Sequence, residues 1–242
     1  MLQDETYQRR RFEFDLWTGT FFWPIPKGDA ETMLAPTQQE LNALRKGNQL
    51  DMKLIHRIEK IAERERFFHW ILEFPNVFNG AKRGFDCVIG NPPWELLQLE
   101  EIQFFANLAP DIALLKGSKR KKAIKELFCS NPYLKIRFNE KKHAFDSQNR
   151  FISDSGLFSY TTTGIISISS FVTELSYILV SEFGYVGLII PTGIATDYST
   201  KAFFDHLMSK NQVEKLIGFE NEEFLFTGIA NVVRYAIFVI SG

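Results

Sequence analysis

The chain has 242 residues, of which 45% are hydrophobic and 14% aromatic, and Phe alone occurs 24 times. This composition excludes a disordered chain and predicts one large domain or two small ones with a substantial buried core. The net charge of −1 excludes a protein that coats DNA through overall positive charge.

Cysteine and histidine usage predicts neither a metal site nor an oxidising compartment. Cys87 and Cys129 form no CxxC pair, and the four histidines lack the spacing of metal ligands. So few cysteines are typical of a cytoplasmic protein. The first residues do not resemble a signal peptide, and no run of 18 apolar residues occurs, so we expect no membrane span.

Residues 1–80 are predicted to form a helical segment. Residues 12–26 are aromatic-rich and indicate a short helix or an extended piece that ends at a Pro/Gly turn. Thr37 is a candidate N-cap with Glu40 at the third helical position. Asp51 opens a longer amphipathic helix that is expected to reach about Trp70.

Residues 81–242 are predicted to form the larger part of the fold. A short apolar run at 85–89, bounded by glycines, is typical of a buried parallel strand, and a helix is expected to follow Pro93. Further helices are predicted at 118–129, 171–182 and 201–209, and further strands at 184–191, 213–220 and 232–240. This alternation predicts an α/β fold with a parallel sheet, flanking helices and a helical insertion at about 95–165.

One segment of the insertion is strongly basic. Between Lys116 and Lys142 the chain has ten Lys or Arg and two Glu. Such a run is either a solvated helix face or a surface that contacts phosphates.

The sequence Asn91-Pro92-Pro93-Trp94 directly follows the first predicted strand. In open α/β sheets, ligands bind beyond the carboxyl ends of strands. The exocyclic amine of adenine is a poor nucleophile, and the Asn91 side-chain carbonyl and the Pro92 backbone carbonyl could accept its hydrogen bonds. Trp94 offers a face for a base drawn out of the duplex. The alternative is that this turn is only structural.

The segment FDCVIGNPPWE resembles motif IV of amino-methyltransferases, an FD-hydrophobic strand followed by (N/D)PP(Y/F/W). Flanking blocks resemble the type IIG restriction–modification enzymes and the PglX-like methylases of BREX phage defence. They include FFHWILEFPNVF, GYVGLIIPTGIATDYSTKAFFDHL and IGFENEEFLF, and the resemblance covers about residues 67–242, and residues 14–26 more loosely.

This resemblance implies a partial Rossmann-like methyltransferase sheet and a site-specific adenine-N6 DNA methyltransferase that uses S-adenosylmethionine on double-stranded DNA. By this resemblance, the site that binds the adenine amine consists of Asn91, Pro92, Pro93 and Trp94. Phe85 and Asp86 carry over as strand-end support, with Asp86 the candidate for cofactor contact. The candidate DNA contacts are Lys119, Arg120, Lys121, Lys122, Thr192, Asp197 and Lys201. Thr192 and Asp197 could equally cap the next helix.

The chain departs from the family pattern at two places. The Gly-rich loop that binds S-adenosylmethionine is expected upstream of motif IV, and nothing like it precedes Phe85. The block TGRGDxN appears as TTTGIISIS. The resemblance therefore implies the target-base half of a catalytic domain, which a missing N-terminal half or other defence-system subunits would complete.

Two alternative functions remain open at this point. The chain could be an inactive DNA-binding or assembly fragment of such a system, as the missing Gly-rich loop favours. It could also be an NPPY-type methyltransferase that acts on glutamine or on RNA, although those enzymes are compact and lack the long insertion.

Overall fold

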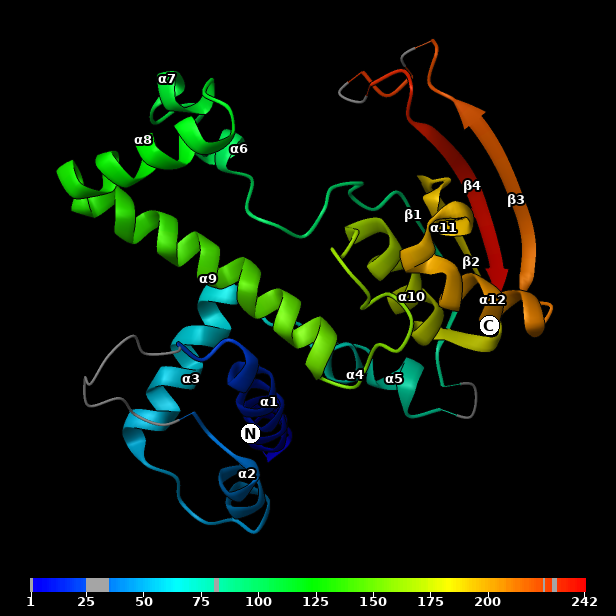
Figure 1. The fold of residues 1–242 in the computed structure, drawn as a ribbon. Helices are drawn as coiled ribbons and strands as arrows, with labels where there is room; N and C mark the ends of the chain where they lie inside the picture. The colour runs from blue at the N-terminus through cyan, green and yellow to red at the C-terminus, as the bar shows by residue number, and fades with distance from the viewer. Residues whose placement is uncertain (1, 25–34, 81–82, 224, 228–229) are drawn as a thin grey trace.

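The computed structural model describes residues 2–24, 35–80, 83–223, 225–227 and 230–242. Its helices and strands form an α/β structure with a four-stranded mixed sheet. Helical units project from the sheet domain on one side (Figure 1). No helix over the described residues is both long enough and apolar enough to cross a membrane.

The N-terminal helices are α1 (Leu2–Phe21), α2 (Gln38–Arg45), α3 (Met52–Glu65), α4 (Trp70–Glu73) and α5 (Pro75–Phe78). The rings of Trp70 in α4 and Phe78 in α5 contact Phe85. Helices α1, α2 and α3 pack around one hydrophobic cluster. Leu16 of α1 and Ile58 of α3 are fully buried in this cluster. The first helix begins far earlier than residue 12, so the prediction of a short piece at 12–26 was wrong in its start.

The predicted caps of α2 and α3 are confirmed. The Thr37 side chain accepts from the backbone N–H of Gln39, and the Glu40 carboxylate accepts from the Thr37 backbone N–H at 2.7 Å. Asp51 accepts from the Lys53 N–H. Helix α3 ends at Glu65 rather than near Trp70, because Arg66 adopts a left-handed conformation with φ of 56°.

Four consecutive helices after the first strand carry the basic segment away from the sheet. They are α6 (Glu101–Phe105), α7 (Pro110–Ala113), α8 (Gly117–Ser130) and α9 (Pro132–Asp154). Phe105, Ile124 and Leu134 form a small core where α6–α9 meet. This group lies at the end of α9 remote from the sheet (Figure 1). Helix α8 confirms the prediction at 118–129, whereas the length of α9 was not predicted.

The segment after Pro93 is not helical before Glu101, so the prediction of a helix directly after Pro93 was wrong. Leu97 donates its backbone N–H to Ile166, and Ile168 donates to Glu95, so the chain is extended here. These hydrogen bonds join segments some 70 residues apart. Local helical spacing of apolar residues cannot reveal such a tertiary partner.

The sheet contains β1 (Phe85–Gly90), β2 (Val180–Pro191), β3 (Val213–Glu220) and β4 (Arg234–Ser241), in the order β1-β2-β4-β3. The β1 and β2 strands are parallel, whereas β4 is antiparallel to both β2 and β3. The sheet is therefore mixed, and the prediction of a wholly parallel sheet was wrong. Strands β3 and β4 follow one another with no helix among the described residues between them, which favours antiparallel pairing.

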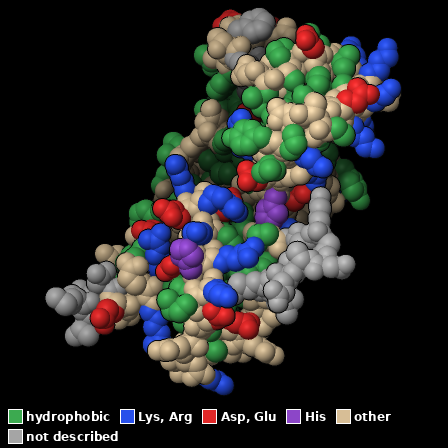
Figure 2. Space-filling view, turned by 90° about the vertical axis from the view of Figure 1, so that its left-hand side faces the viewer, with side chains coloured by type: hydrophobic (Ala, Val, Ile, Leu, Met, Phe, Trp, Pro, Cys, Tyr) green, Lys and Arg blue, Asp and Glu red, His purple; other side chains and the backbone are tan. Residues whose placement is uncertain are grey.

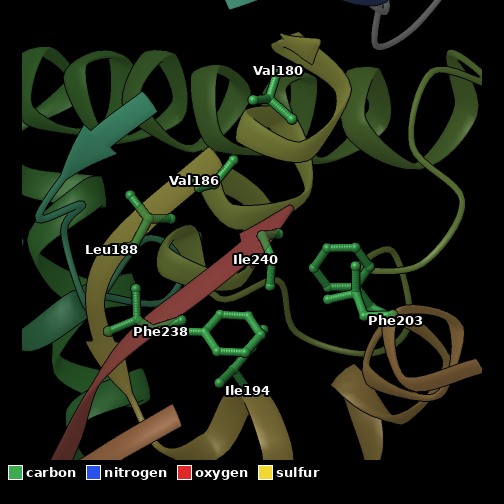
Figure 3. Packing of buried hydrophobic residues seen from close by; sticks show 9 residues of the cluster. Val180, Val186, Leu188, Ile194, Phe203, Phe238 and Ile240 are labelled. Atoms are coloured by element: carbon green, nitrogen blue, oxygen red, sulfur yellow. The ribbon is translucent and has the colours of Figure 1, made fainter. Parts of the chain in front are cut away.

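One face of the sheet is covered by α10 (Ile168–Leu179), α11 (Gly193–Thr196) and α12 (Lys201–Ser209). Val186 and Leu188 of β2 and Phe238 of β4 pack there against Ile194 and Phe203 (Figure 3). Helix α12 has the predicted bounds, and α10 begins and ends three residues earlier than expected. A 3-10 turn, η1 (Tyr198–Thr200), joins α11 to α12.

The opposite face of the sheet and the outer edge of β1 are open. Ile89 of β1 is 85% exposed, and Ile217 and Ile237, which pair across β3 and β4, are 47% and 37% exposed. The prediction that residues 85–89 form a buried strand was therefore wrong in its burial. The reason is that β1 pairs with β2 on one side and has no strand on the other among the described residues.

A buried carboxylate anchors the segment before α10. Glu174 is 2% exposed, and it accepts hydrogen bonds from the backbone N–H groups of Ser159, Tyr160 and Thr161. The Thr161 hydroxyl donates a fourth at 2.6 Å. These charge-assisted bonds satisfy a carboxylate that would otherwise be costly to bury.

His206 of α12 links two tyrosines behind the sheet. The Tyr177 hydroxyl donates to Gln212, so it accepts from Nε2 of His206 at 3.2 Å, and the Tyr160 hydroxyl lies 3.0 Å from Nδ1. Burial, and to a smaller extent the nearby Lys210 charge, lower the pKa of His206 below its usual value. The neutral imidazole is thus the form that the fold favours.

This pKa direction predicts a pH dependence of stability. Between the folded-state pKa and about 6.5 the unfolded chain binds more protons, so the free energy of unfolding falls as pH drops through that window. Urea unfolding at about pH 7 and about pH 5 should show a smaller loss for His206→Gln than for the wild type. His56→Gln, at an exposed position, is the control and should behave as the wild type. An identical loss in His206→Gln would contradict the assignment.

Candidate functional site

Loops that follow three strands meet at one end of the sheet. Strands β1, β2 and β3 end at Gly90, Pro191 and Glu220. Pro191 pairs with Tyr235, and Glu220 pairs with Arg234, at the start of β4. Because β4 runs in the opposite direction, the carboxyl ends of the other three strands share this end. Ligands of open α/β sheets bind at such an end.

The NPPW segment begins directly at the end of β1. Asn91 is exposed, Pro92 is buried, Pro93 is exposed and Trp94 is partly buried. The indole N–H of Trp94 donates to Oδ1 of Asn91 at 3.0 Å and to the backbone carbonyl of Ile189 at 3.2 Å. This second contact ties the segment to β2. The Asn91 side chain is therefore exposed on a loop that a hydrogen bond to β2 holds in place.

The Trp94 ring belongs to an aromatic cluster on the open face of the sheet. It contacts Phe226 at 4.8 Å and Tyr235 at 5.7 Å between ring centroids, and Tyr235 stacks on Phe219 at 5.4 Å. Sequence analysis expected this ring to offer a face to a base. In the structure, side chains of the protein already contact it.

Asn221 fixes the position of Phe226 in this cluster. It is fully buried, and its side chain exchanges two hydrogen bonds of 3.1 Å with the backbone N–H and C=O of Phe226. Sequence reasoning missed Asn221, Phe226 and Tyr235 as residues of this site. The IGFENEEFLF block contains the first two, but the contact of Phe226 with Trp94 spans more than 120 residues of chain.

The loop after β2 lies at the same end of the sheet. Thr192 donates its backbone N–H to Arg234 at 3.1 Å, and the Asp197 carboxylate folds back over Gly193. Neither Thr192 nor Asp197 makes a side-chain capping bond to the helical turn that follows it. Capping is thus not their role in this structure. Lys201 is exposed and forms an ion pair with Asp205 one turn along α12.

The basic residues of α8 do not join this site. Lys119, Lys121 and Lys122 are exposed, whereas Arg120 is partly buried. The Arg120 guanidinium donates to Glu101 at 3.0 Å and to the Leu115 carbonyl at 3.1 Å, so it stabilises the contact between α6 and α8. Figure 2 faces the side of the molecule on which α8 projects, and Lys and Arg side chains gather at its upper edge.

Asp86 also lies away from the convergent loops. It is the second residue of β1 and is exposed. Gly90 lies four positions further along the chain, which corresponds to roughly 13 Å along a strand. Among the described residues the chain before β1 forms helices α1–α5, so no strand-end loop is available there to hold a nucleoside cofactor.

One family model matches part of the chain. Residues 29–129 match the model of the Eco57I restriction-modification methylase family. The matched region contains α2 to α7, β1, the NPPW segment and most of α8, and it is less than half of the chain. Neither the curated proteins nor the solved structures compared with the chain gave a match. The family match supports a methyltransferase of restriction–modification systems, and with it a DNA methyltransferase role.

Proposed function

We propose that this chain provides the target-base part of an adenine-N6 DNA methyltransferase in a restriction–modification or phage-defence system. The observation that carries the proposal is the placement of Asn91. It is exposed at the carboxyl end of β1, where three loops converge, and it lies within the region that matches the methylase family.

The chemistry of the proposed reaction needs hydrogen-bond acceptors beside the amine. The lone pair of the adenine amine is delocalised into the ring, and acceptors that hold its N–H groups restore nucleophilic character to the nitrogen. The Asn91 side-chain carbonyl has two lone pairs, of which Trp94 uses one. The remaining lone pair and the backbone carbonyl of Pro92 are the proposed acceptors. Because two prolines restrict the loop, little reorganisation is needed.

Asn91→Ala tests this assignment. We expect the variant to lose methyl transfer to adenine by about 100-fold or more, because it removes an acceptor that acts on the reacting group. The measurement is N6-methyladenine in unmethylated double-stranded DNA, by mass spectrometry, for the chain co-expressed with its genomic neighbours. Asn107→Ala, at an exposed turn, is the matched control. Absence of N6-methyladenine with the wild-type chain would overturn the proposed function.

The methyl donor proposed is S-adenosylmethionine, because methylases of this family generally use it. The described residues do not fit a complete site for it, since helices alone precede β1. The open edge of β1 and the exposed Ile89 support a further polypeptide segment that extends the sheet there, and the exposed Ile217 and Ile237 support cover over the open face. Sheets with parallel strands usually bury both faces. We place that segment, which holds the donor, in a partner or elsewhere in the same protein.

Titration calorimetry tests where the donor binds. The chain alone should show no heat of binding for S-adenosylmethionine, and the chain with its partner segment should bind it. Micromolar binding to the chain alone would contradict the proposed division of the site. Asp86→Ala would then show whether β1 contributes to that binding.

The exposed lysines of α8 are proposed to contact DNA phosphates outside the site. Replacing Lys119, Lys121 and Lys122 by Ala removes three positive charges. We expect weaker DNA binding and a decrease of about 2 to 3 in the slope of log K against log salt concentration. The three residues Lys46, Lys53 and Lys60 are exposed on the N-terminal helical unit, and their replacement is the matched control. An unchanged slope in the α8 variant would rule out this contact. Thr192, Asp197 and Lys201 are proposed to contact the flipped nucleotide instead, because they lie in the segment that runs from the end of β2 to the start of α12.

The two free cysteines are both exposed. Exposed thiols persist in reducing compartments, so we propose that the methyl transfer takes place in the cytoplasm. A purified chain that carried a Cys87 or Cys129 disulfide as isolated under non-reducing conditions would argue against this location.

A further inference from the structure

The contact between Trp94 and Asn91 constrains the orientation of the Asn91 amide. An indole N–H is a donor and cannot accept. It therefore selects the carbonyl oxygen of Asn91, at 3.0 Å, and rejects the NH2 group. Rotation of the amide by 180° would place two donors against each other. The chemistry of the partner thus fixes which amide atom of Asn91 lies beside the Trp94 N–H.

The donor in this contact is itself held rigidly. The same N–H reaches the carbonyl of Ile189, which lies in the β2 strand. The ring is packed against Phe226 and Tyr235, and Asn221 holds the Phe226 backbone. Because these contacts do not involve Asn91, the position of the Trp94 N–H does not depend on the amide that it orients.

We propose that Trp94 is a positioning residue that sets the orientation of the Asn91 amide through its indole N–H. This inference rests on the proposed function, in which Asn91 accepts a hydrogen bond from the substrate amine. With the N–H in place, Oδ1 keeps one lone pair for that amine, and no rotation of the amide is needed when the substrate arrives. A Phe at this position would supply a ring but no donor. The role of Trp94 is therefore distinct from stacking.

The first experiment observes the contact directly by NMR of the 15N-labelled chain. The chain has four Trp, so the indole signals of Trp17, Trp23 and Trp70 are internal references. The Asn91 side-chain NH2 signals are identified by their loss in Asn91→Ala. In Trp94→Phe we expect these NH2 signals to shift towards those of an Asn side chain that rotates freely about its Cβ–Cγ bond. In Asn91→Ala we expect hydrogen exchange of the Trp94 indole to rise about 3- to 10-fold.

Phe226→Leu separates the N–H from the packing of the ring. It removes an aromatic neighbour of Trp94 and keeps the indole donor. The Asn91 NH2 signals should stay near their wild-type positions in this variant. If Phe226→Leu moved them as far as Trp94→Phe does, packing rather than the hydrogen bond would orient the amide, and the proposal would be overturned. It would also be overturned if Trp94→Phe left them unmoved.

The second experiment measures methyl transfer by the complex used for Asn91→Ala. Loss of one neutral hydrogen bond that orients a reacting group should lower kcat about 3- to 10-fold in Trp94→Phe, with an unchanged KM for DNA. Trp70→Phe is the control outside the convergent loops. A Trp94→Phe kcat equal to that of the wild type would contradict the proposal. If the wild-type complex transferred no methyl groups, the proposed function would fail, and the NMR comparison would still decide how Asn91 is oriented.

Discussion

The parallel pairing of β1 with β2 is the constraint on which the candidate site depends. Near their start the two strands approach so closely that Gly84 and Gly184 have no room for a side chain. A Cβ on Gly84 would lie 2.5 Å from the backbone nitrogen of Ser181, and a Cβ on Gly184 would lie 2.6 Å from the carbonyl oxygen of Phe85. The register shifts at this point and then runs regularly from Cys87 to Gly90. As a result, Asn91 emerges beside the end of β2, where Trp94 can reach Ile189.

The antiparallel direction of β4 brings the aromatic cluster to this end of the sheet. Because β4 lies between β2 and β3, its first residues stand among the carboxyl ends of the other strands. Tyr235 is thereby placed under Trp94 and beside Phe226. A parallel strand in the same position would bring its last residues here and its first residues to the opposite end. The aromatic cluster is thus a consequence of strand direction, and it holds the Trp94 ring independently of any substrate.

Local signals in the sequence predicted those elements whose structure is decided locally. The capping box at Thr37, the bounds of α12 and the strand at 213–220 all follow from residues close together in the chain. Residues 95–100 were mispredicted because their backbone groups pair with residues 166–168. The exposure of β1 was also missed, because an apolar run does not reveal how many neighbours its strand has. The position of Asn91 was predictable from a strand followed by NPP, whereas the Asn221–Phe226 contact was not.

The loops at one end of the sheet are well packed, whereas the open face and the outer edge of β1 are exposed. The end that carries Asn91 is held by hydrogen bonds and ring contacts that are complete within the chain. The outer edge of β1 and the side chains of Ile89 and Ile217 leave backbone groups and apolar surface exposed to water. Exposed surface of that kind is typical of an interface. If a further segment covers it, Asn91, the proposed amine acceptor, needs no rearrangement when that segment docks, because Trp94 already holds the Asn91 amide through contacts to β2. The proposed division would let the target-base part be preorganised while the donor is brought in separately, and it would account for aromatic packing and an open sheet edge in one chain.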